Sequence, residues 1–380
     1  MNKGIIGVAD KMAYATGALS DVIMANIVFQ LSGPIYIQGL HVSPVLIGLA
    51  ISIPRFWDAF TDPIMGNISD NSRLKWGRRK PFMLIGALFA GIFCSVMWMP
   101  PVSLSQSGLF VYFLITSILF FTAYTVFSVP FNALGYEMTL DYDERTSIMS
   151  YKTFMMNTGS AFLLPWAYKL CLLPIFGGNE IVGARYVGVL FGLMIVASAV
   201  IPSFFAKERV QGQAQPPIKI LDAFKYTISN KPFLLINCIV LSTLTGVFLA
   251  FPLLFYINLS YICPGDKGLT ATMTGWYGTV YGLAGIVGVP VINYLGRRFD
   301  KKKALLGGLS VIGLGFILSW WLFTPNAPYL QLVFAVLASP SLSCVFILTS
   351  SMMADVCDVD ELSTGLRREG MYGAVFGFLV

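Results

Sequence analysis

Ten apolar runs, each long enough to cross a lipid bilayer, constrain this sequence more than any other feature. A membrane-spanning helix needs about 20 mainly apolar residues. The runs that meet this need cover residues 13–38, 44–69, 82–100, 109–134, 147–173, 186–206, 232–257, 271–295, 304–324 and 330–353. An eleventh run begins near residue 369 and continues to Val380, so we expect the given sequence to stop inside an eleventh helix.

The composition supports a membrane protein. Of the 380 residues, 56% are Ala, Val, Ile, Leu, Met, Phe, Trp, Tyr or Cys, and only 12% are charged. A soluble domain has about 25% charged residues, so this chain has too few to cover a water-exposed surface. The six cysteines are scattered without a C-x-x-C spacing, which argues against a disulfide scaffold. We therefore expect an all-α polytopic membrane protein.

The positive charge is concentrated in alternate loops. The loops 70–81, 207–231 and 296–303 each contain five Lys or Arg. Because cytoplasmic loops carry an excess of Lys and Arg, these three loops and the N-terminus are predicted to be cytoplasmic. The net charge of +6 therefore reports membrane topology, and we expect no nucleic-acid partner.

The sequence also contains an internal repeat. A Gly-Arg-Arg triplet at 77–79 recurs at 296–298, and an acidic loop that starts at Glu137 recurs from Asp355, both at nearly the same offset. Two unrelated features that share one offset predict a duplicated six-helix unit. The expected domains are an N-terminal six-helix bundle at 1–206, a cytoplasmic linker at 207–231 and an incomplete C-terminal bundle at 232–380.

The second apolar run contains three charged residues, Arg55, Asp58 and Asp62, at i, i+3 and i+7 on one helix face. Each costs about 2.5–3.5 kcal/mol at the centre of a membrane helix, so they need partners or water. Arg55 can neutralise one carboxylate, and the remaining like-charged pair favours a bound proton or a small cation. The alternative is that the pair only holds the helix against a neighbour.

Two further ionisable residues fall inside the expected spans. Asp21 lies about eight residues into the first run, and Lys152 lies about five residues into the fifth. A lysine this close to the end of a span can extend its side chain to the interface, so Lys152 alone does not indicate a site. Asp21 is compatible with a structural or a binding role.

Enzyme signatures are missing from the sequence. It contains no G-x-x-x-x-G-K-[ST], H-E-x-x-H or G-x-S-x-G motif, and the single histidine, His41, cannot form a metal cluster. We expect no enzymatic activity, no cofactor and no metal beyond a coupling cation. A channel or an intramembrane enzyme is the alternative from another functional class.

Several segments resemble one family of transporters. Residues 54–66 read PRFWDAFTDPIMG, residues 76–81 read WGRRKP and residues 141–145 read DYDER, while REG follows at 368–370. These segments resemble the glycoside–pentoside–hexuronide:cation symporters, the melibiose permease family of the major facilitator superfamily. The pattern D-A-x-x-D-P-x-x-G within a helix is the specific part of the match. The resemblance covers the whole chain.

The resemblance implies a fold and two neighbouring sites. The fold would be the major facilitator fold of two pseudo-symmetric six-helix bundles. The cation would bind to Asp58 and Asp62, with Thr61 and Thr125 as neutral ligands. The sugar site would be formed by residues of the first, fourth and fifth spans: Asp21, Ser128, Asn132 and Lys152.

Three of these positions depart from melibiose permease. It has Asp at the position of Ser128, Trp at that of Asn132 and Arg at that of Lys152, so a galactoside held by paired carboxylates is not expected here. The function implied by the resemblance is Na⁺-, Li⁺- or H⁺-coupled symport of a sugar or glycoside by alternating access. An amphipathic or lipid-like solute is the alternative within transporters.

The repeated basic and acidic loops also predict a cytoplasmic gate made of ion pairs. Its expected members are Arg78, Arg79, Glu137, Arg145, Arg297, Arg298, Asp355, Asp358 and Arg367. The family resemblance further implies a protein of the bacterial cytoplasmic membrane, with a small-molecule solute as its partner and the lipid bilayer as its surroundings. We expect it to function as a monomer.

Overall fold

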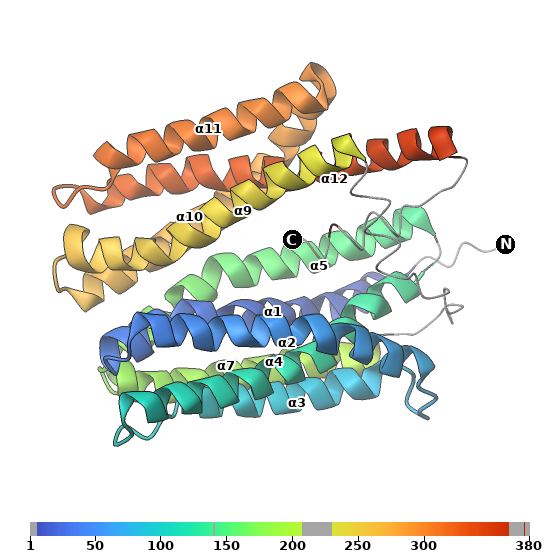
Figure 1. The fold of residues 1–380 in the computed structure, drawn as a ribbon. Helices are drawn as coiled ribbons and strands as arrows, with labels where there is room; N and C mark the ends of the chain where they lie inside the picture. The colour runs from blue at the N-terminus through green and yellow to red at the C-terminus, as the bar shows by residue number, and fades with distance from the viewer. Residues whose placement is uncertain (1–5, 140, 207–229, 365–375, 377–380) are drawn as a thin grey trace. The chain divides into compact units, whose positions relative to one another are not determined.

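The computed structural model describes residues 6–139, 141–206, 230–364 and 376, and every regular element in these residues is a helix (Figure 1). The chain divides into two compact units, Met1–Ala214 and Gln215–Val380. Most of the linker expected at 207–231 lies outside the described residues. The expected domain boundaries therefore remain predictions.

Unit 1, Met1–Ala214, contains seven α-helices within its described residues. They are α1 (Val8–Ser32), α2 (Pro44–Asn71), α3 (Lys80–Met97), α4 (Gln106–Glu137), α5 (Tyr142–Phe162), α6 (Ala167–Cys171) and α7 (Glu180–Phe205). Two of the helices start at side-chain caps, because Ser105 accepts a hydrogen bond from Gly108 N at α4 and Asn179 accepts one from Ile181 N at α7. These caps satisfy backbone N–H groups that have no partner within the helix.

Unit 2, Gln215–Val380, contains four long helices within its described residues. They are α9 (Lys231–Ile257), α10 (Lys267–Phe299), α11 (Lys301–Leu322) and α12 (Gln331–Thr364). Asn230 caps α9 by accepting a hydrogen bond from Phe233 N, and Asp266 caps α10 by accepting one from Leu269 N. α12 packs against both α10 and α11.

Eight helices in the described part of the chain are long and apolar enough to cross a membrane. The other two long helices, α2 and α5, cover predicted spans but are more polar, and α2 carries Arg55, Asp58 and Asp62. The predicted fifth span, 147–173, differs from the structure. α5 ends at Phe162, and a turn that contains Pro165 precedes the short helix α6, because proline cannot donate the helical hydrogen bond. The part of the eleventh run that reaches Val380 lies almost entirely outside the described residues.

Small residues bring the helices of unit 1 close together. α3 packs against α4 and α7 (Figure 1). A Cβ atom at Gly91 of α3 would lie 2.8 Å from the carbonyl oxygen of Gly192 on α7, and one at Gly86 would lie 2.5 Å from the backbone nitrogen of Phe127 on α4. Such close backbone approach is the usual way in which membrane helices associate.

α1 lies between α7 and α5 and contacts both helices. Its buried Tyr14 stacks on Phe131 of α4 with 4.8 Å between the ring centroids. Ser20 Oγ donates a hydrogen bond to the carbonyl oxygen of Ile195 on α7, at 2.9 Å. α1 and α4 are therefore held in fixed register, which positions the polar residues that both helices carry.

Candidate cation and solute site

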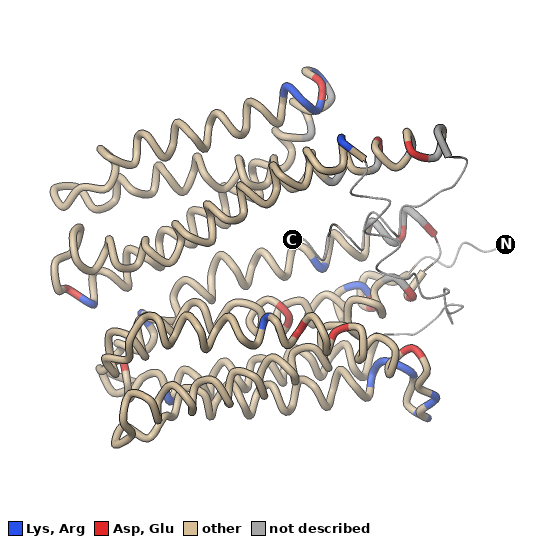
Figure 2. The backbone as a smooth tube through the Cα atoms, viewed as in Figure 1, with Lys and Arg blue, Asp and Glu red and all other residues tan. Residues whose placement is uncertain are grey.

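Most Lys, Arg, Asp and Glu residues lie near the ends of helices, and a small group lies within the helices of unit 1 (Figure 2). This group consists of Asp21 on α1, Arg55, Asp58 and Asp62 on α2, and Lys152 on α5. Charged side chains within membrane helices are costly and usually mark ion or substrate pathways. The group is therefore the candidate functional site.

The two carboxylates of α2 have different partners. Asp62 Oδ1 accepts a hydrogen bond from Thr125 Oγ1 of α4 at 2.7 Å. Asp58 Oδ2 lies 3.4 Å from Arg55 Nη1, one turn earlier on α2. Asp58 Oδ1 is buried and has no hydrogen-bond partner among the described residues. The site thus contains a carboxylate oxygen that can still accept a proton or contact a cation.

The two predicted threonine ligands behave differently. Thr125 is buried and directs its hydroxyl to the Asp62 carboxylate. Thr61 Oγ1 instead donates to backbone oxygens of its own helix, to Trp57 O at 3.3 Å and more weakly to Asp58 O at 3.5 Å. Among the described residues no group of three or more His, Cys, Asp or Glu could hold a metal ion. Of the two threonines, only Thr125 thus contacts a carboxylate of α2 through its side chain.

The four predicted solute residues form one hydrogen-bonded chain across three helices. Ser128 Oγ of α4 donates to Asp21 Oδ1 of α1 at 2.9 Å. Asn132 Nδ2 donates to Ser128 Oγ at 3.1 Å, and Asn132 Oδ1 accepts a hydrogen bond from Lys152 Nζ of α5. Lys152 also lies 5.3 Å above the ring of Phe131. The lysine is thus held within the group and does not act alone.

α4 connects the cation residues with the solute residues. Thr125 faces Asp62, while Ser128, one turn later on the same helix, faces Asp21. Residues at i and i+3 lie on the same side of a helix. Asp62 of α2 and Asp21 of the polar chain are therefore both hydrogen-bonded to neighbouring positions on α4.

The structure adds contacts around Arg55 that sequence reasoning missed. The guanidinium lies 4.4 Å above the ring of Phe121 and 5.1 Å from that of Phe29, and its Nη2 donates to Ala25 O at 3.3 Å. Trp57, two residues after Arg55 on α2, donates a hydrogen bond from Nε1 to Thr122 Oγ1 at 3.0 Å. Aromatic residues are so frequent in this sequence that no sequence signal could identify Phe29 and Phe121 as the rings beside Arg55.

The basic loop before α3 forms an ion-pair network in unit 1. Arg79 is buried and donates to Glu137 Oε2 at 3.0 Å, to Asp70 Oδ1 at 2.7 Å and to Ser69 Oγ at 3.1 Å. Arg78 pairs with the same Glu137. The predicted gate residues Arg78, Arg79 and Glu137 therefore lie together and connect the ends of α2 and α4. Asp70 and Ser69 were not among the predicted members.

The pKa of the Arg79 guanidinium reflects this environment. Burial lowers that pKa, but the hydrogen bonds and negative charges of Glu137 and Asp70 outweigh the effect and raise it above its ordinary value. The guanidinium therefore remains charged, and it balances two carboxylates in a place where an unpaired charge would be costly.

The equivalent region of unit 2 is arranged differently. Asp355 of α12 pairs with Lys301, at 2.6 Å, a residue that the sequence prediction did not include. Arg298 instead donates to Tyr294 Oη on α10 and stacks on Tyr294 and Phe299. The other predicted gate residues have side chains or whole residues outside the described part of the chain: Arg145, Arg297, Asp358 and Arg367.

The comparisons with known proteins identify the family. The family model described as MFS/sugar transport protein matches residues 13–380. The "Putative glycoside/cation symporter YagG" of Escherichia coli (strain K12) is 27% identical, over 97% of this chain and 78% of that protein. The "Isoprimeverose transporter" of Lactiplantibacillus pentosus is 24% identical, over 100% of this chain and 78% of that protein.

Solved structures show the same fold. The crystal structure of nucleoside transporter NupG covers 97% of this chain and 86% of its own with a TM-score of 0.64 at 15% identity. The crystal structure of D-xylose-proton symporter matches 92% of this chain and 88% of its own chain, with a TM-score of 0.59 at 12% identity. The chain therefore has the major facilitator fold and is an integral membrane transporter. It belongs to the MFS/sugar transport protein family and, within it, to the glycoside–pentoside–hexuronide:cation symporters.

Proposed function

We propose that this protein couples the movement of a cation to the uptake of a sugar or glycoside. The observation that carries the proposal is that α4 is hydrogen-bonded twice, through Thr125 to Asp62 of α2 and through Ser128 to Asp21 of the polar chain. Relatives described as a glycoside/cation symporter, an isoprimeverose transporter and a glucuronide carrier homologue support a sugar-like solute.

The α2 carboxylates suit three coupling cations. Na⁺ and Li⁺ are hard cations that prefer oxygen ligands, which Asp58, Asp62 and Thr125 Oγ1 supply. A proton could instead reside on one carboxylate, because two nearby carboxylates share one proton more easily than they carry two charges. Thr61, whose hydroxyl donates to its own helix backbone, has a lesser role in this proposal.

The polar chain suits a solute rich in hydroxyl groups. A sugar hydroxyl both donates and accepts hydrogen bonds, and the chain offers a carboxylate at Asp21 and an ammonium group at Lys152. Ser128 and Asn132 lie between them, and each donates one hydrogen bond and accepts another within the chain. The solute would compete for these bonds when it binds.

We further propose that alternating access is controlled at the end of unit 1 that carries the basic loop. The Arg78, Arg79 and Glu137 cluster would stabilise one conformation of the carrier. The positive charge of that loop supports a cytoplasmic location for the loop and for the N-terminus. The protein would act as a monomer in the bacterial cytoplasmic membrane.

The test neutralises each α2 carboxylate in turn. In proteoliposomes, Asp58→Asn and Asp62→Asn should abolish cation-driven accumulation of the solute, whereas downhill exchange should persist because the polar chain remains. Asp300→Asn is the matched control, because Asp300 is exposed between α10 and α11 and the substitution removes a carboxylate charge outside the candidate site. Normal accumulation with unchanged cation dependence in both site variants would contradict the proposed cation site. Parallel measurements of Na⁺, Li⁺ and H⁺ flux would identify the coupling ion.

A further inference from the structure

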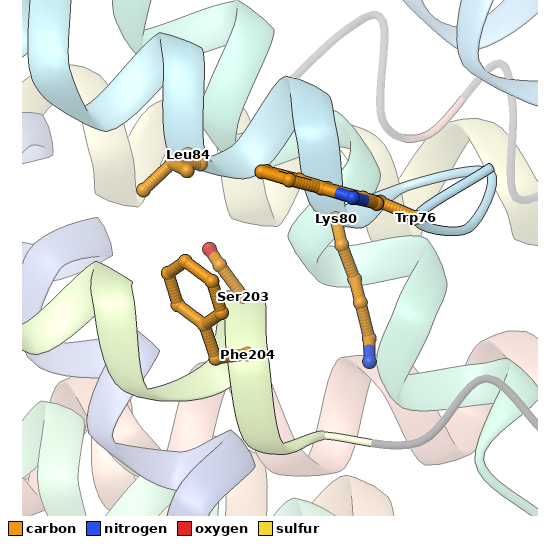
Figure 3. Close-up of a pocket in the computed structure, with 5 residues that line it drawn as sticks. All are labelled: Trp76, Lys80, Leu84, Ser203 and Phe204. Carbon is orange, nitrogen blue, oxygen red and sulfur yellow. The ribbon is translucent and has the colours of Figure 1, made fainter. Parts of the chain in front are cut away.

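A small cavity lies between the start of α3 and the end of α7, away from the candidate transport site. Its volume is about 260 Å³, and five side chains line it (Figure 3). They are Trp76, Lys80, Leu84, Ser203 and Phe204. Small-molecule pockets usually measure about 300–1,000 Å³, so this cavity suits a compact chemical group more than a whole organic solute.

Two aromatic residues of the cavity, Trp76 and Phe204, contact each other and remain exposed. The rings of Trp76 and Phe204 have centroids 6.3 Å apart and planes inclined by 52°. Both side chains remain largely exposed, Trp76 at 69% and Phe204 at 55%. Tryptophan concentrates where the hydrocarbon of a bilayer meets its headgroups, and this preference favours headgroup depth for the cavity.

The polar residues of the cavity match a phosphate that is attached to a glycerol. Lys80 supplies an ammonium group at the first residue of α3, which can donate to phosphate oxygens. Ser203 Oγ donates to Ala199 O at 2.7 Å, so its lone pairs can accept a hydrogen bond from a hydroxyl group. The cavity therefore combines a cation, a hydroxyl acceptor and aromatic walls.

The charge around the cavity favours an anion. The loop that leads into α3 carries five Lys or Arg residues between 73 and 80. Two acidic residues at this end of unit 1, Asp70 and Glu137, are both paired with Arg79. Basic pockets between helices at the cytoplasmic side of a membrane are recognised sites for anionic lipid headgroups.

An apolar track leads away from the cavity along α3. Leu88 and Ile92 follow Leu84 at i+4 and i+8, and both are exposed, at 42% and 55%. Residues at this spacing lie on one side of the helix. They offer a surface for an acyl chain, which a free phosphate or a soluble sugar phosphate does not have.

We propose that this cavity binds the headgroup of an anionic glycerophospholipid, with the phosphate beside Lys80 and an acyl chain along Leu88 and Ile92. The α2 carboxylates and the polar chain take no part in this site, so it does not depend on the proposed transport function. The bound lipid would fix the ends of α3 and α7 at the interface.

The test measures lipid binding to the purified protein by native mass spectrometry, with phosphatidylglycerol and phosphatidylcholine as probes. Phosphatidylglycerol should bind more tightly than phosphatidylcholine. Lys80→Gln should weaken phosphatidylglycerol binding about fivefold, the factor that one cation near an anionic lipid surface contributes. Lys80→Arg should retain the binding. Lys302→Gln removes one exposed charge from α11 of unit 2 and is the matched control.

A second measurement locates the lipid. The fluorescence difference between the unmodified protein and Trp76→Phe reports Trp76, and phosphatidylglycerol with brominated acyl chains should quench it more than brominated phosphatidylcholine. Equal binding of both lipids, or equal weakening by Lys80→Gln and Lys302→Gln, would overturn the proposal. Competition by soluble glycerol phosphate as strong as that by the lipid would assign the cavity to a free anion instead.

Discussion

At the scale of single residues, the two threonines beside the α2 carboxylates direct their hydroxyl groups to different partners: Thr125 to Asp62, and Thr61 to the backbone of its own helix. The spacing of Arg55, Asp58 and Asp62 alone places them on one helix face, because the helical period fixes it. Thr61 and Thr125 were equivalent candidates by family resemblance. Only the structure distinguishes them, since a hydroxyl can donate either to a neighbouring helix or to its own backbone, and sequence does not specify which.

This difference predicts unequal effects of two threonine substitutions. Thr125→Ala should raise the Na⁺ or Li⁺ concentration needed for half-maximal uptake about tenfold or more, because it removes an oxygen ligand together with the hydrogen bond that orients Asp62, and a hydrogen bond to a charged group contributes about 1.5–3 kcal/mol. Thr61→Ala should change it little, and Thr125→Ser should restore it. Solute uptake measured across a cation series checks this result, and equal effects of the two alanine variants would argue against Thr125 as the ligand.

At the scale of elements, hydrophobicity predicted where helices occur, and local chemistry decided where they end. Every one of the ten apolar runs lies on helical segments. The fifth run contains Pro165, at which a membrane helix can either bend or stop, and the structure shows a stop after Phe162. Helix partners were not predictable either, because close contacts such as Gly91 with Gly192 join residues far apart in the sequence.

The α3–α7 contact predicts a stability difference between two identical substitutions. Gly91→Ala would place a Cβ 2.7 Å from Val196 Cγ2 and 2.8 Å from Gly192 O. Such overpacking should cost about 1–3 kcal/mol. Gly313→Ala on α11 meets nothing within 4 Å and serves as the control. Thermal unfolding in detergent should show a lower midpoint for Gly91→Ala alone, and a similar midpoint for both variants would mean that α3 and α7 separate easily.

At the scale of the whole molecule, the family resemblance predicted the fold and the family, whereas the sequence predicted individual ion pairs less well. The major facilitator fold and the symporter family follow from both the sequence and the comparisons. The ion pairs at the ends of the helices were only partly predictable. Arg79 reaches Glu137 as expected, but Asp355 pairs with Lys301, because clustered basic residues offer several partners within reach of one carboxylate.

The proposed orientation predicts which loops face the cytoplasm. Ser72 lies between α2 and α3, and Ser103 lies between α3 and α4, at the opposite end of α3. The test uses the two variants Ser72→Cys and Ser103→Cys. In intact cells a membrane-impermeant maleimide should label Cys at 103 and reach Cys at 72 only after permeabilisation. Each variant needs a background in which exposed Cys238 is replaced. The reverse labelling pattern would place the N-terminus outside.

The position of Thr125 and Ser128 on one helix has a thermodynamic consequence. A displacement of α4 that improves the contact with Asp62 also moves the hydroxyl bound to Asp21. Coupling between two ligands is reciprocal, so the factor by which the cation raises solute affinity equals the factor by which the solute raises cation affinity. With the proposed roles, both factors are set by the rigidity of one turn of α4. A carrier built this way would stay weakly occupied by either ligand alone and fill when both are present.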